Sequence, residues 1–262
     1  MRKLPLAKIL ANIRLKWLIF TLLVLVALVK LALWQVSRAE EKQLRLNRIA
    51  QFQHQQAFSF AEVLQPINAN KLTYLADELD SLNDLPVRLS ATFDASKVFL
   101  LDNQVNNNQL GYRVFQLAYA QEQAFLVNLG WVQGSIDRQQ LPNITPLSGE
   151  YLFSGHIRVP ERGIMLQAQN FTQIQWPLRV QQIELDKFAK LLNISILPFV
   201  IYVAESEEIG FAKKWQPIVM PPEKHQAYAV QWFALALAWL LLMLWALIKS
   251  SQESHENNNK VS

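Results

Sequence analysis

The sequence predicts an α+β membrane protein in which two transmembrane helices flank a β-rich domain outside the cytoplasm. Apolar runs lie near both ends of the 262-residue chain, at residues 17–36 and 228–248. Several stretches between them alternate apolar and polar side chains, which is the period of a half-buried strand. As a helix, each apolar run is about 30 Å long, which matches the hydrocarbon core of a bilayer.

The charge distribution predicts which side of the membrane each segment occupies. Residues 1–16 contain no acidic residue and five basic ones, Arg2, Lys3, Lys8, Arg14 and Lys16. The positive-inside rule places this segment in the cytoplasm. The rest of the chain carries 20 Lys and Arg against 21 Asp and Glu, so we expect no nucleic-acid partner.

The two spans predict a multi-pass membrane protein with both termini in the cytoplasm. Residues 37–227 are then periplasmic, and the polar tail 249–262 returns to the cytoplasm, where we expect it to be disordered. A cleaved signal peptide is the competing interpretation of the first run. It is disfavoured because no small-x-small cleavage site follows, and Lys30 can extend its amine to the headgroups.

The first half of the central domain predicts a helix followed by hairpins. Residues 37 to about Gln56 lack Gly and Pro and continue the first span as a helix, and residues 70–82 form a weaker helical or loop segment. The alternation of residues 87–93 predicts a strand. Residues 97–104 follow a short turn and are its expected hairpin partner. Residues 106–111 are expected to form a loop with a turn at Gly111.

The second half predicts further strands around one short helix. Residues 112–120 and 124–132 form a hairpin across a polar turn, and a strand follows at 151–159. A strand after Pro177, a helix with Asp186 as its N-cap, and a last strand at 198–206 complete the domain. This order predicts a sheet curled into a small antiparallel barrel or sandwich.

Motifs for catalysis are scarce. The absence of cysteine excludes disulfides, thiolate metal sites and cysteine nucleophiles. The four histidines have no paired ligand spacing, and no nucleotide-binding or nucleophile-elbow motif occurs. We therefore expect no enzyme. Two alternatives stay open: a membrane-tethered hydrolase or transferase that uses His54 or His156 as a base, and a structural or sensory module that binds another membrane protein.

Three local patterns have both a structural and a functional interpretation. The first, at the outer mouth of the first span, is an interfacial anchor by its chemistry and comprises Trp34, Gln35, Arg38 and Lys42. The second is an apolar strand with a packed tryptophan and contains Asn128, Gly130 and Trp131. The third opens the second span with His225, Tyr228, Gln231 and Trp232, roughly on one helical face. It is either an aromatic belt or an axial histidine ligand beside flat rings that hold a haem.

These patterns, in this order, resemble the surfeit-locus (Surf/Shy) family of cytochrome c oxidase assembly factors. The resemblance runs from about residue 31 to residue 240 and adds Gly111, Tyr112, Val114, Leu126 and Val127 to the residues above. This chain has Ala32 and Leu33 where the family usually has Gly. It has Leu129 where Arg is usual, and Phe115, Gln116 and Leu117 replace a Thr-Pro-Leu. It therefore resembles a divergent bacterial-type member, which implies a location in the bacterial inner membrane with the central domain in the periplasm.

The resemblance implies a membrane-anchored factor that assists haem a insertion into the catalytic subunit of haem–copper oxidase. It implies that His225 ligates the haem iron and that Tyr228, Gln231 and Trp232 contact the haem, which is bound transiently. The expected partners are the oxidase catalytic subunit, a haem a synthase and membrane lipid. The residues of the first two patterns are then motif or partner contacts.

Overall fold

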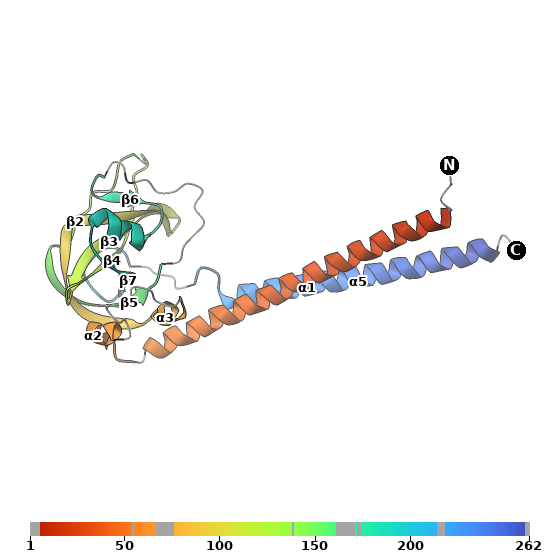
Figure 1. Ribbon diagram of the computed structural model, residues 1–262, viewed down its shortest axis with the longest axis horizontal. Helices are drawn as coiled ribbons and strands as arrows, with labels where there is room; N and C mark the ends of the chain where they lie inside the picture. The colour runs from red at the N-terminus through yellow and green to blue at the C-terminus, as the bar shows by residue number, and fades with distance from the viewer. Residues whose placement is uncertain are drawn as a thin grey trace. The chain divides into compact units, whose positions relative to one another are not determined.

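The computed structural model describes residues 6–53, 55–65, 76–137, 139–160, 171, 174–213 and 218–259. The chain divides into two compact units, Met1–Asn47 with Pro217–Ser262, and Arg48–Gln216. The first unit contains two long helices, α1 (Leu6–Gln53), whose last turns extend into the second unit, and α5 (Pro222–Asn259). The second unit contains the β-sheet with three short helices (Figure 1).

Helices α1 and α5 lie side by side and run in opposite directions (Figure 1). The indole nitrogen of Trp239 donates to the carbonyl oxygen of Thr21 at 3.3 Å. Farther along the pair, Nδ1 of His225 lies 2.7 Å from Oε1 of Gln35. Residue numbers rise on one helix as they fall on the other, so α1 begins and α5 ends at the same end of the pair.

The side chains between the two helices recur at alternating intervals of three and four residues. This is the heptad spacing of helices that pack along one continuous stripe. We call this stripe the seam; it consists of Thr21, Leu25, Leu28, Ala32, Gln35, Ala39 and Lys42 on α1, and Pro222, His225, Ala229, Trp232, Ala236, Trp239 and Met243 on α5. Ala32, Ala39, Ala229 and Ala236 are buried, and small side chains at these positions let the two backbones approach closely.

The outward faces of the helix pair are apolar. Leu22 and Leu23 on α1 and Leu241 and Leu242 on α5 are each more than half exposed, as are further aromatic and aliphatic side chains. Helices of soluble proteins turn their apolar stripe inward, so this pair has the reverse arrangement. Both helices are long and apolar enough to cross a membrane by length and composition. The structure thus confirms the prediction of two long apolar helices that flank a β-rich domain in the sequence.

The ends of the two helices differ from the prediction in detail. Helix α1 ends at Gln53, close to the expected Gln56. Helix α5 continues to Asn259, so the prediction of a disordered tail is wrong for residues 249–259. That stretch contains neither Gly nor Pro, and nothing in it stops a helix that is already formed.

The β-rich unit is built on one sheet that closes on itself. Its path runs β2 (Pro86–Asn106), β3 (Gln109–Ala120), β4 (Gln123–Gln133), β7 (Ile196–Val203) and β5 (Gly149–Arg158), and β5 pairs with β2 again. Two short strands, β1 (Phe58–Ser59) and β6 (Leu178–Val180), are added along β2. The pairs β1–β2, β2–β6 and β4–β7 are parallel, so the sheet is mixed and the prediction of a purely antiparallel one is wrong.

Strand β2 replaces the first predicted hairpin. The chain does not reverse between residues 94 and 97; it continues as one strand with a register shift between Phe93 and Val98. The Asp94 carboxylate accepts hydrogen bonds from the Ser96 backbone N–H and hydroxyl at 2.8 and 2.6 Å. This local bonding forms a bulge, which bends a strand without ending it. The first part of β2 pairs with β5 and the second part with β3.

Tight turns connect β2 to β3 and β3 to β4. The β3–β4 hairpin is confirmed, and its two turn residues, Gln121 and Glu122, have positive φ values of 48° and 61°. The β2–β3 turn uses Asn107 and Asn108, with φ values of 48° and 60°. It lies within the predicted loop of residues 106–111, but the prediction of a turn at Gly111 is wrong. Asn adopts this left-handed conformation more easily than most residues, which explains the shift.

The short helices also differ from their predicted form. Helix α4 (Leu185–Leu192) has Glu184 at its N-cap without a side-chain cap bond, so the prediction of Asp186 as the cap is wrong; Asp186 lies in the first turn. The strand predicted after Pro177 is reduced to β6. Helix α3 (Ala76–Ser81) overlaps the predicted 70–82 segment, of which residues 70–75 lie outside the described residues.

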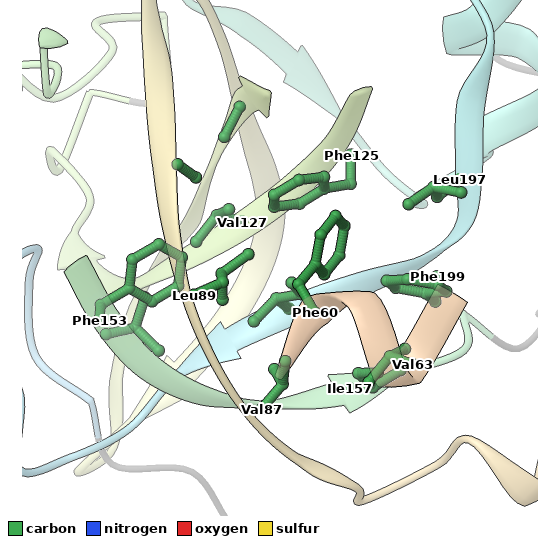
Figure 2. Close-up of a cluster of buried hydrophobic side chains, with 14 of the residues drawn as sticks. Phe60, Val63, Val87, Leu89, Phe125, Val127, Phe153, Ile157, Leu197 and Phe199 are labelled. Atoms are coloured by element: carbon green, nitrogen blue, oxygen red, sulfur yellow. The ribbon is translucent and has the colours of Figure 1, made fainter. Parts of the chain in front are cut away.

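The main core lies inside the closed sheet. Helix α2 (Phe60–Leu64) inserts Phe60 among the strands, with its ring centroid 5.1 Å from that of Phe125 (Figure 2). On the outer side, α4 places the buried Phe188 against Phe99 of β2, with stacked rings 4.5 Å apart. Strands β3, β4 and β7 therefore contribute side chains to both apolar clusters, which explains their nearly continuous apolar sequences.

A capping box fixes the start of α2. The Ser59 hydroxyl accepts from the Glu62 backbone N–H, while the Ser59 backbone N–H and hydroxyl both donate to the Glu62 carboxylate at 2.7 Å. These hydrogen bonds, from the side chain first and then from the backbone, lower the pKa of Glu62. Because folding lowers the pKa of Glu62, its ionised carboxylate stabilises the folded protein at neutral pH. This stabilisation is lost as the pH falls through the lowered pKa.

Replacing Ser59 with Ala should destabilise the β-rich unit by about 1 kcal/mol, the usual effect of removing an N-cap. The loss should shrink in acid, where Glu62 is protonated in both proteins. Denaturant unfolding of the two proteins at neutral and acid pH measures this difference. Equal stability at neutral pH would contradict the capping role.

The helix pair predicts a specific cross-link. The antiparallel register that joins Gln35 to His225 brings Ala32 opposite Ala229, and the chain has no cysteine of its own. The double variant Ala32→Cys/Ala229→Cys should therefore form an intramolecular disulfide under mild oxidation, detected by its gel mobility with and without reductant. The pair Leu23→Cys/Leu241→Cys, on outward faces, is the control and should stay reduced.

Candidate functional site

Two predicted site residues, His225 on α5 and Gln35 on α1, meet in a polar contact across the seam. His225 lies in the first turn of α5 and is only 8% exposed, and its Nδ1 is 2.7 Å from Oε1 of Gln35. Gln35 is half-buried in the middle of α1. Ala32, Ala39 and Ala229 lie next along the seam, so the two polar groups meet among small apolar side chains.

The four predicted residues of α5 do not share one environment. His225 and Trp232 both face the seam, because seven residues bring a helix back to almost the same direction. Tyr228 is 46% exposed and Gln231 is exposed, so they point away from α1. The structure therefore groups His225 with Gln35 and Trp232, and leaves Tyr228 and Gln231 on the neighbouring outer surface.

The remaining residues of the first motif lie on the outer side of α1 or along the seam. Trp34 is half exposed, and the Arg38 guanidinium lies 5.9 Å from the centroid of its ring. Arg38 also forms an ion pair with Glu41 at 2.6 Å. Lys42 is half-buried at a seam position. Within this motif, Gln35 is the residue that joins α5 through a hydrogen bond.

The Gly130 motif makes a bulge in β4. The side-chain oxygen of Asn128 accepts from the Gly130 backbone N–H at 2.9 Å, and Gly130 has a φ of +117°. A Cβ at Gly130 would lie 2.8 Å from the carbonyl oxygen of Ala212, which is too close for any other residue. Leu129 is buried in the main core, where a charged arginine side chain would have no water around it.

Trp131 joins three segments of the β-rich unit. Its backbone N–H donates to the carbonyl oxygen of Ala212 at 2.8 Å, and its indole nitrogen donates to that of Gln104, also at 2.8 Å. Its ring lies against Gly111, where a Cβ would come within 2.7 Å of ring carbons. Gly111 and Trp131, which belong to separate sequence motifs, therefore pack directly against each other.

His54 and His156, the two histidines considered as bases for hydrolysis, are distant in sequence from both Gln35 and His225. His54 is outside the described residues. His156 lies on β5, with its ring 5.5 Å from that of Tyr202 on the paired position of β7. Among the residues that the structure describes, no group of three His, Asp or Glu is placed to hold a metal ion.

Comparison with known families assigns the chain. The model of the SURF1 family matches residues 22–237, most of the chain. The protein belongs to the SURF1 family. This confirms the resemblance drawn from the sequence motifs. Family members are associated with cytochrome c oxidase assembly and are assembly factors, not known enzymes. No curated protein matches this SURF1-family chain. The matched stretch includes Gln35, the Gly130 motif and His225.

Sequence reasoning found both Gln35 and His225 but not their contact. They are 190 positions apart, and no local pattern joins them. A signal is nevertheless present, because polar side chains inside apolar helices usually face a partner within the protein. The segment at Phe211 and Ala212 that bonds to β4 was not predicted either, since its sequence lacks strand periodicity.

Replacing Gly130 with Ala should destabilise the β-rich unit of this SURF1-family protein. The strained φ alone costs about 1–3 kcal/mol, and the contact with Ala212 adds to it. Thermal unfolding of the detergent-solubilised protein measures the effect. Gly149→Ala is the matched control for positive φ, because nothing lies within 4 Å of a Cβ there. Equal losses in both variants would show that close packing at Gly130 contributes nothing.

Proposed function

We propose that the protein is a membrane-anchored assembly factor for haem–copper (cytochrome c) oxidase that assists haem a insertion into the catalytic subunit. Membership of the SURF1 family supports the role in oxidase assembly. The observation that carries the haem step is the histidine of the seam, His225, whose Nδ1 is held by Gln35. Imidazole nitrogen is a common axial ligand of haem iron.

The proposed location is the bacterial inner membrane, with the β-rich unit in the periplasm and both termini in the cytoplasm. Three features support it: the basic N-terminal segment, the outward apolar side chains of the helix pair and the antiparallel course of α1 and α5. His225, in the first turn of α5, is then at the periplasmic boundary of the bilayer, and lipid surrounds the outer faces of both helices.

The residues around His225 fit a haem on chemical grounds. The Gln35 contact occupies Nδ1, and no hydrogen bond to Nε2 of His225 is found within the described part of the chain. Haem would supply an iron whose axial position accepts such a nitrogen. Trp232 offers a flat aromatic ring two turns along the seam, while Tyr228 and Gln231 offer a ring and an amide on the neighbouring outer surface.

The proposed partners are the oxidase catalytic subunit, which receives haem a, and a haem a synthase, which provides it. A catalytic role is not part of the proposal. The hydrolase or transferase and the structural or sensory module remain alternative hypotheses, and no contact in the described residues favours either of them.

Deleting the gene from a strain with a haem–copper oxidase should lower both the haem a absorbance of its membranes and oxidase turnover. Restoring the full-length chain should recover both. Normal haem a content and normal turnover in the deletion strain would contradict the proposed function.

Replacing His225 with Ala should abolish or strongly weaken haem binding by the purified protein, because the iron loses its nitrogen ligand. Visible absorbance during haem titration in detergent measures this loss. His255→Ala, which removes a histidine from the C-terminal part of the same helix, is the control and should bind like the wild type. Unchanged binding in the His225 variant would show that the ligand lies elsewhere.

A further inference from the structure

We propose that Gln35 is a positioning residue that keeps the proton of His225 on Nδ1 and thereby presents Nε2 as the iron ligand. This inference rests on the proposed haem role of His225 and assigns a task to the α1 helix in the same site. Gln35 itself need not touch the haem.

The chemistry of the Gln35–His225 contact determines which of its two atoms can donate a hydrogen bond. Gln35 directs its side-chain oxygen to Nδ1 of His225 across 2.7 Å, and an amide oxygen can only accept a hydrogen bond. The two atoms therefore form a hydrogen bond only when Nδ1 carries the proton. A neutral imidazole carries one N–H, so Nε2 then holds an unshared electron pair, the form that binds a metal.

The surroundings make this preference strong. His225 is 8% exposed and Gln35 is half-buried, so water competes weakly for either group. Buried alanines on both helices, Ala32 and Ala229, lie one turn away and allow the backbones to come close enough for the contact. A proton placed on Nε2 would set the Nδ1 lone pair against the Gln35 oxygen and leave two acceptors facing each other, which is unfavourable in an apolar environment.

We expect the Gln35 contact to change how the His225 imidazole binds iron and to leave the rest of the fold unaffected. A hydrogen bond to the second ring nitrogen fixes the direction of the imidazole and raises its basicity toward a metal, and loss of such a partner typically costs 10–100-fold in metal affinity. Gln35 and His225 thus act as one unit built from both helices, although they come from opposite ends of the chain.

The first test needs no haem. Nitrogen NMR of the full-length protein in detergent, with ¹⁵N-labelled histidine and the His225 signals assigned by loss in His225→Ala, distinguishes protonated from unprotonated ring nitrogens. The wild type should carry its proton on Nδ1. Gln35→Glu, which retains an acceptor oxygen, should keep a proton on Nδ1, whereas Gln35→Leu should abolish the preference for that nitrogen. A wild-type proton on Nε2, or an unchanged spectrum in Gln35→Leu, would overturn the inference.

The second test measures haem binding. Gln35→Leu should weaken haem affinity at least tenfold and alter the iron–histidine spectrum, while Gln35→Glu should restore the affinity and lower the reduction potential, because a stronger acceptor makes the imidazole a better electron donor. Gln43→Leu is the matched control: the same substitution on the exposed side of α1 should leave affinity and spectrum unchanged. Equal affinity and identical spectra in wild type and Gln35→Leu would overturn the inference.

The two hypotheses fail differently. If the wild type binds no haem, the haem step of the proposed function is wrong, and the nitrogen spectrum still decides where Gln35 holds the proton. If the wild type binds haem and Gln35→Leu is unaffected, the function stands and the positioning role is wrong. The Ala32–Ala229 cysteine cross-link reports whether the helix pair persists in each variant. If Gln35→Leu no longer forms this cross-link, the positioning role is tested instead by the proton position and the reduction potential of Gln35→Glu.

Discussion

The packing of α1 against α5 is the constraint on which the candidate site depends. Both helices turn apolar side chains outward, so in a lipid environment burial of apolar surface gives little reason for them to associate. Close approach at buried alanines and interhelical hydrogen bonds must supply that reason, and a polar contact of this kind is worth about 0.6–2 kcal/mol. The Gln35–His225 bond therefore stabilises the helix pair and also orients its histidine.

The family motifs separate into two physical kinds. Those around Gly111, Gly130 and Trp131 hold the β-rich unit together through backbone proximity, a positive φ and an indole hydrogen bond. Those on the helices place Gln35 and His225 in contact among small apolar side chains. The first kind would be needed for any use of this fold, whereas the second kind carries the functional proposal.

The sequence was most informative where one physical signal dominates. Length and hydropathy predicted both long helices, and simple alternation predicted the strand from Val87. The polar turn at residues 121–123 predicted the β3–β4 hairpin. The error at residues 94–97 arose because Asp94 bonds to Ser96, a polar pattern that forms a turn in one context and a bulge in another. Parallel pairing of β4 with β7 and the Gln35–His225 contact depend on residues distant in the chain, which no local period encodes.

The separation of 190 positions between Gln35 and His225 has a consequence for biosynthesis. Gln35 leaves the ribosome long before its partner, and every strand of the sheet is made in between. A chain interrupted at any point before α5 thus lacks the paired histidine altogether. Only a polypeptide that has been synthesised past residue 225 can form the complete polar pair.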